Sequence, residues 1–243
     1  MKFGLLLAAL ALVINSQYVW SESIVDEFSR GIDIAVHKKT LPSLLSPNSS
    51  TPVLNEKPYP HLLSIFDRIK ASIKPVVDDF ELKLVDHGDL RCDRQRKYIL
   101  VDLTILTKFT KQTTDPDLVF AALFAHEFAH YIFDITMNDF PDHDGPLGPM
   151  PIMVEGKEIP FTDYEHANTE GYACEILWRA GYKLPEIQKA YDDIFPTVQE
   201  ILNDLKGDPS TDLASRRAIV AAWLKQKSLS LDAHPSQNET GPK

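Results

Sequence analysis

The strongest constraint on the fold is an apolar segment from Leu118 to Phe133 that contains only a few polar side chains. Asp115 and Pro116 precede it, and an acidic N-cap followed by proline is a favoured helix start. A helix that is apolar nearly all round is stable only when neighbouring elements cover it on every side. We therefore expect this helix to lie at the centre of the core.

Polar residues occur inside this predicted helix in the order His126, Glu127 and His130, an H-E-x-x-H motif. Burial of charged and imidazole groups is costly unless they have partners, and a metal ion supplies one. Two histidines four residues apart lie on one helix face and can bind a single zinc ion, while the glutamate polarises a water molecule. The motif predicts a zinc-dependent hydrolase with His126 and His130 as ligands and Glu127 as general base.

A catalytic zinc ion also needs a third protein ligand and an open position for water. Candidates lie in the next predicted helix, where His166 and Glu170 are four residues apart and continue the stripe that contains Ala173. Glu165 lies about a hundred degrees away around that helix. We rank His166 first, Glu170 second and Glu165 third. Whichever of His166 and Glu170 does not bind zinc is expected to orient a ligand imidazole.

From about Pro60 to Leu224 the chain resembles the gluzincin metallopeptidases of the CAAX prenyl protease, HtpX and BepA group. The matching parts are a helix, a strand pair and the zinc helix, at Ile65 to Ile73, Phe80 to Val85 with Tyr98 to Asp102, and Phe124 to His130. The resemblance implies an α+β, mostly helical, zincin-like domain with a small antiparallel β-edge beside the zinc helix. It also implies a zinc endopeptidase that acts on a protein or peptide substrate.

The second motif of that family differs here, because His166 replaces the ligand glutamate while Glu170 falls on a family aspartate. This change would give a three-histidine site. A Thr-His-Pro whose histidine is assigned to the oxyanion is replaced by residues 207–210, Gly-Asp-Pro-Ser. His143 and Arg216 are candidate substitutes, although a surface role is the simpler interpretation for His143. The resemblance further implies that the strand from Tyr98 to Asp102 binds an extended substrate by β-addition.

The N-terminus has the pattern of a signal peptide, with Lys2 before an apolar stretch from Phe3 to Ile14 and small residues at Val19 and Ser21. An uncleaved anchor is the alternative. Secretion or export to a periplasm is expected. The predicted divisions are a signal peptide at 1–21, an N-terminal arm and linker at 22–60, the metallopeptidase domain at 61–231 and a disordered tail at 232–243.

The formal net charge of −10 argues against a nucleic-acid partner, because phosphate binding requires a basic face. No segment after the signal peptide is apolar enough to predict a membrane span. Cys92 and Cys174 are the two cysteines, and the sequence leaves open whether they form a disulfide or remain thiols.

Two alternatives to the peptidase remain open at this stage. The first is a catalytically silent zinc-binding relative that acts as a partner-binding protein, because the third ligand and the oxyanion residue differ from the family pattern. The second is a structural zinc site or a metal-free helical domain.

Overall fold

The computed structural model describes residues 24–39, 61–85, 90–111, 113–137, 152–154, 157–159, 161–204 and 209–233. The predicted signal peptide, most of the predicted linker and most of the predicted tail lie outside these ranges. The structure is mostly helical, with 73% helix and 10% strand, which confirms the α+β, mostly helical class. Within the described ranges, no helix is long and apolar enough to cross a membrane.

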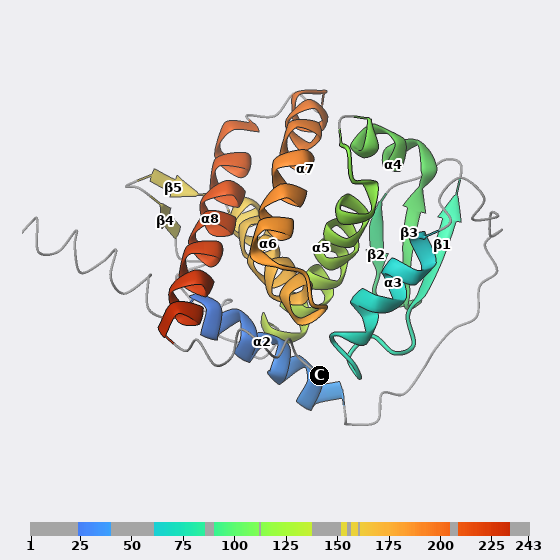
Figure 1. The fold of residues 1–243 in the computed structure, drawn as a ribbon, viewed down its shortest axis with the longest axis horizontal. Helices are drawn as coiled ribbons and strands as arrows, with labels where there is room; N and C mark the ends of the chain where they lie inside the picture. The colour runs from blue at the N-terminus through green and yellow to red at the C-terminus, as the bar shows by residue number, and fades with distance from the viewer. Residues whose placement is uncertain are drawn as a thin grey trace, which may run out of the picture.

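Four long helices lie side by side in the main body, as Figure 1 shows. They are α5 (Pro116–Met137), α6 (Phe161–Arg179), α7 (Leu184–Asp204) and α8 (Pro209–Ala233). Helix α5 is the central one, and its Phe120, Phe124 and Phe128 are buried against other elements. The prediction of a buried central helix is thereby confirmed, and the motif residues are carried into the interior with it.

The segment from residue 22 to 60, expected as an arm and linker, begins with helix α2 (Ile24–Lys39), which packs against α5, α6 and α8. Phe28 and Ile32 of this helix are buried in the core. The crossing of α2 and α6 is close because Gly171 has no side chain, and a Cβ at that position would overlap with the Phe28 ring.

Buried charges also join α2 to the bundle. The Glu175 carboxylate on α6 lies 3.2 Å from Arg179 Nε, 3.1 Å from Lys227 Nζ of α8 and 3.4 Å from the Ser29 hydroxyl of α2. Arg179 also donates to the Ser29 hydroxyl at 2.7 Å. Breaking one member of such a network leaves a buried charge without a partner, so these contacts fix α2 in place.

The β-edge is a three-stranded mixed sheet in the order β1 (Glu81–Val85), β3 (Tyr98–Asp102), β2 (Arg91–Asp93). The predicted pairing of the first and last of these strands is parallel, not antiparallel. The reason is β2, a third strand that the expected strand pair did not include. It forms the antiparallel hairpin with β3 through residues 94–97, where Lys97 has a φ of 59°. The first strand therefore pairs with the opposite edge of β3.

This topology also corrects the expected substrate strand. All five residues of β3 are buried, and β1 and β2 occupy its two edges, so β3 cannot accept a further strand. Among the strands that the structure describes, β2 is the edge strand that contacts α5, the helix that carries the H-E-x-x-H motif.

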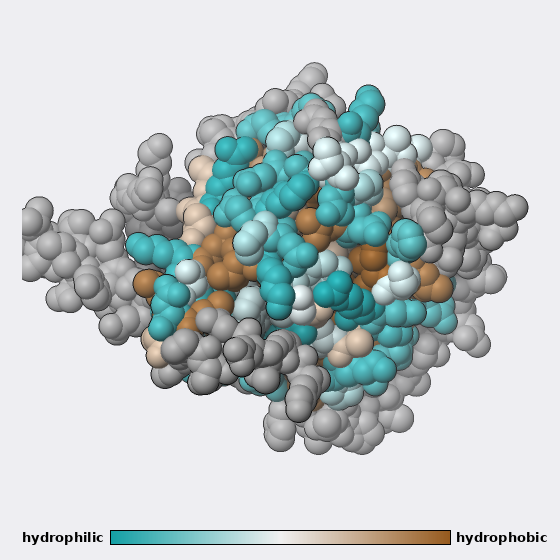
Figure 2. All heavy atoms as spheres, viewed as in Figure 1, coloured by the Kyte–Doolittle hydropathy of each residue, from teal (hydrophilic) through white to brown (hydrophobic). Residues whose placement is uncertain are grey.

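Shorter elements complete the fold. Helix α3 (Leu62–Ala71) packs on α5, helix α4 (Leu103–Thr110) follows β3, and β4 (Ile152–Val154) pairs antiparallel with β5 (Lys157–Ile159). Helix α7 contains Pro196 and continues through it. Pro196 is exposed, so solvent can satisfy the backbone carbonyl that it leaves unpaired. Cys92 and Cys174 are free thiols. The described surface in the view of Figure 2 is largely hydrophilic, with smaller apolar areas.

The contact between α2 and α6 gives a first prediction. Substituting Gly171→Ala should destabilise the protein by about 1–3 kcal/mol, because the new methyl group overlaps with the Phe28 ring. Chemical denaturation would measure the change. The double substitution Phe28→Leu with Gly171→Ala should lose less stability than the sum of the two single changes. Strict additivity would contradict a direct overlap.

Candidate functional site

The two motif histidines of α5 face each other. His126 Nε2 lies 3.2 Å from His130 Nε2, and the two rings are nearly perpendicular, with centroids 4.7 Å apart. This arrangement follows from the spacing of four residues, which places both side chains on one face of α5. The other nitrogen of each ring points to α6.

Both rings have a partner on α6 at Nδ1, and the partner of His126 fixes its tautomer. His126 Nδ1 lies 3.1 Å from Glu170 Oε2, and His130 Nδ1 lies 3.4 Å from the Thr169 hydroxyl oxygen. A carboxylate only accepts hydrogen bonds, so His126 Nδ1 donates to Glu170. When its ring is neutral, His126 therefore presents its Nε2 lone pair to His130, whereas the Thr169 hydroxyl can either accept from His130 Nδ1 or donate to it.

At 3.2 Å the two Nε2 atoms are within hydrogen-bond distance, so a proton can lie between them in the metal-free protein, and a metal ion can take the place of that proton. Two nitrogen ligands of a tetrahedral zinc ion, at about 2.0–2.1 Å from the metal, are separated by roughly 3.3–3.4 Å. The observed distance agrees with this value. Carboxylate–histidine pairs of the same kind commonly orient zinc ligands in proteins. The donor set of His126 and His130 therefore fits a zinc ion.

Glu170 is held from its other side by Arg216 of α8. Arg216 NH1 lies 3.2 Å from Glu170 Oε1, and both side chains are almost fully buried. Burial alone would raise the pKa of Glu170, but His126 and Arg216 lower it to about 2. Burial also disfavours protonated His126, yet the charge of Glu170 outweighs this effect and raises the pKa of His126. The result is a buried row of contacts from Arg216 of α8 through Glu170 of α6 to His126 of α5.

Glu127, the predicted general base, is 7% exposed and lies at the border between α5 and β2. Burial raises the pKa of Glu127 to about 7, although His126 and a hydrogen bond from the Cys92 backbone N–H both favour its ionised form. A carboxyl group with such a pKa can accept and release a proton near neutral pH. Burial, with Glu127 nearby, also raises the pKa of the Cys92 thiol to about 12, so this cysteine is not a nucleophile.

The two further ligand candidates whose side chains are described, His166 and Glu170, have different surroundings. His166 on α6 lies against His130, with ring centroids 5.7 Å apart. Glu170 uses its carboxylate for His126 Nδ1 and Arg216, so it has the position of an orienting residue. The Glu165 side chain and the whole of His143 lie outside the described residues. Within the described part of the chain, no three His, Cys, Asp or Glu side chains have the spacing of a complete metal site.

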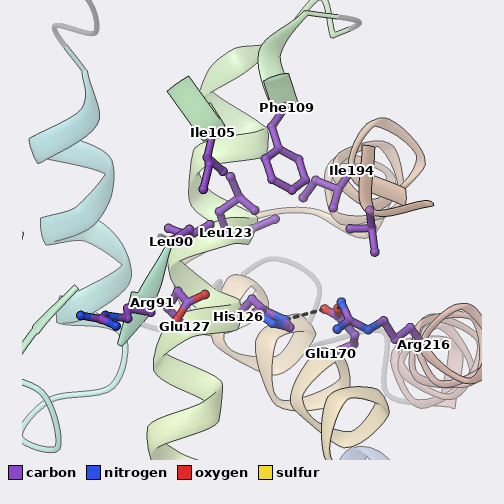
Figure 3. Close-up of a pocket in the computed structure, with 12 residues that line it drawn as sticks. Leu90, Arg91, Ile105, Phe109, Leu123, His126, Glu127, Glu170, Ile194 and Arg216 are labelled. Atoms are coloured by element: carbon purple, nitrogen blue, oxygen red, sulfur yellow. Dashed lines mark hydrogen bonds and ion pairs between the residues drawn. The ribbon is translucent and has the colours of Figure 1, made fainter. Parts of the chain in front are cut away.

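A cavity of about 440 Å³ opens directly beside these groups. Figure 3 shows Arg91, Glu127, His126, Glu170 and Arg216 along one side of it, and Ile105, Phe109, Leu123 and Ile194 along the other. The sequence does not predict the apolar side of the cavity, because its residues come from α4, α5 and α7 and no local pattern links them. Arg216, which the sequence suggested as an oxyanion partner, does line the cavity.

Comparison of the chain with protein-family models, with curated proteins and with solved structures found no match.

The contact between Glu170 and His126 gives a second prediction. Substituting Glu170→Gln removes the charge that orients His126, and should weaken zinc affinity by about 10- to 100-fold in a competition titration with a chromogenic chelator. Glu175→Gln is a matched control, since Glu175 is equally buried on α6 with cationic partners but lies in the network with α2. It should lower the melting temperature without weakening zinc binding. Equal zinc affinities for the two variants would contradict the role of Glu170.

Proposed function

We propose that the protein is a zinc-dependent endopeptidase. The observation that carries this proposal is the pair of Nε2 atoms 3.2 Å apart, each on a ring whose Nδ1 already has a partner on α6. Both Nε2 atoms point to one place, where a single metal ion could bind them together. The adjoining cavity supports a catalytic rather than a closed structural metal site, because a catalytic site needs room for substrate and water.

The side chains have separate roles in this proposal. His126 and His130 bind the zinc ion, and His166 is the candidate third ligand. When bound, the ion supplies Lewis acidity, which activates water and polarises a carbonyl group. Glu127 lines the same cavity as His126, so it can accept the proton of the attacking water and pass it to the leaving amine. Glu170 holds the His126 ring in the orientation and tautomer that binding requires.

Substrate binding is proposed at β2. Leu90 and Arg91 line the cavity, and β2 has a neighbouring strand on one side only among the described strands. An extended peptide can add to such an edge through backbone hydrogen bonds. This assignment replaces β3, whose two edges are occupied. A peptide on β2 would lie next to Glu127, which accepts a hydrogen bond from the Cys92 backbone.

We also propose that the protein acts after secretion or export to a periplasm, on the strength of the predicted signal peptide. Protein or peptide substrates in that compartment are the expected partners.

Substituting Glu127→Gln should leave the zinc content unchanged and reduce peptide hydrolysis by at least about a hundredfold, because an amide cannot accept the proton. Metal analysis and digestion of a broad peptide library, read by mass spectrometry, would measure the two effects. Glu200→Gln on the exposed face of α7 is the control and should retain activity.

Full activity of the Glu127→Gln variant would rule out the proposed mechanism. A wild-type protein that binds one zinc ion and cleaves no peptide would instead favour the silent, partner-binding alternative. Absence of zinc, with no change of melting temperature on adding a chelator, would favour a metal-free domain.

A further inference from the structure

The apolar side of the cavity is assembled from three helices. Ile105 and Phe109 come from α4, Leu123 from α5, and Ile194 and Val198 from α7. Phe109, Leu123 and Ile194 are each only 5% exposed, so their side chains line the cavity without extending into open solvent. Figure 3 shows Ile105, Phe109, Leu123 and Ile194 facing the row of polar groups across the cavity. This wall is thus continuous and belongs to the packed core.

The polar groups of the cavity already have partners within the protein. Both carboxylate oxygens of Glu170 are used, by His126 and by Arg216, and Glu127 accepts the Cys92 backbone N–H. Among the described residues, the one buried side-chain atom without a hydrogen-bond partner is Trp223 Nε1, and Trp223 does not line this cavity.

On the polar side of the cavity, Arg216 pairs with Glu170. The opposite wall offers no side-chain hydrogen-bond partner, so a polar or charged side chain packed against it would lose its water without compensation, which is unfavourable. An apolar side chain would leave water for an apolar wall, which is favourable.

Size and position point to a substrate side chain. A volume of about 440 Å³ lies within the range of roughly 300–1,000 Å³ that is common for small-ligand sites. Because the same cavity is lined by His126 and Glu127, a side chain inside it belongs to a residue next to the bond being cleaved.

We propose that the wall formed by Ile105, Phe109, Leu123, Ile194 and Val198 is a specificity pocket for one bulky aliphatic or aromatic side chain that flanks the scissile peptide bond. Phe109 and Ile194, from two different helices, are its main determinants. This inference rests on the proposed peptidase function and names its substrate class.

Binding to the zinc-loaded Glu127→Gln protein tests the pocket without turnover. The probes are blocked alanine–serine peptides with one central residue varied among Gly, Leu, Phe, Asp and Lys, so any register can place that residue in the pocket. Calorimetry should give Leu and Phe peptides that bind about tenfold to a hundredfold more tightly than the Gly peptide, as expected when such side chains leave water. Asp and Lys peptides should bind no better than the Gly peptide.

Two variants in the same background connect this preference to the wall. Ile194→Asp places a carboxylate in the pocket and should shift the preference from Leu to Lys. Phe109→Ala enlarges the pocket and should improve the binding of a Trp peptide relative to the Leu peptide, which provides a second test if the first variant does not fold. Leu229→Asp, at a position 54% exposed on α8, is the matched control and should leave the preference unchanged.

Equal binding of the five peptides, or a preference that neither wall variant alters, would overturn the inference. Cleavage by the wild-type protein without a preference for apolar residues would also overturn it, while leaving the peptidase proposal intact. Conversely, if the variant binds Leu and Phe peptides selectively but the wild-type protein cleaves none of them, the result would support the apolar pocket and contradict the peptidase proposal.

Discussion

The ion pair between Glu170 and His126 is the interaction on which the candidate site depends. It joins the two central helices, because α5 supplies the histidines and α6 supplies the partners of both Nδ1 atoms. A buried carboxylate is stable only with compensating charges, and Glu170 has them on both sides, from His126 and Arg216. Arg216 of α8, Glu170 of α6 and His126 of α5 thus form one row of contacts across the three helices.

The polar groups in this core have two roles. Towards the protein, they satisfy one another and allow α5 to remain buried. Towards the cavity, they place the His126 ring and the Glu127 carboxylate opposite an apolar wall. Metal binding would replace the contact between the two Nε2 atoms by coordination of both rings, so metal affinity and the stability of the α5–α6 contact are expected to be linked.

Much of this arrangement could be predicted from the sequence, because it depends on local spacing. The apolar run around Phe124 and the H-E-x-x-H spacing predict a buried helix with two facing histidines, and the spacing of His166 and Glu170 places both near it. Strand pairing could not be predicted in the same way. Strand β2 is three residues long, and its pairing depends on the turn at Lys97. The apolar wall likewise depends on tertiary contacts between α4, α5 and α7.

The close packing of α2 on α6 limits which N-terminal residues can be removed without loss of the fold. Phe28 fills the space over Gly171, directly next to Glu170 in the chain, and Ser29 belongs to the network around Glu175. Removal of α2 would expose this apolar contact and leave the buried Glu175 and Arg179 with fewer partners. Truncation of the chain beyond about Ile24 is therefore expected to destabilise the fold, because α2 is part of the packed core.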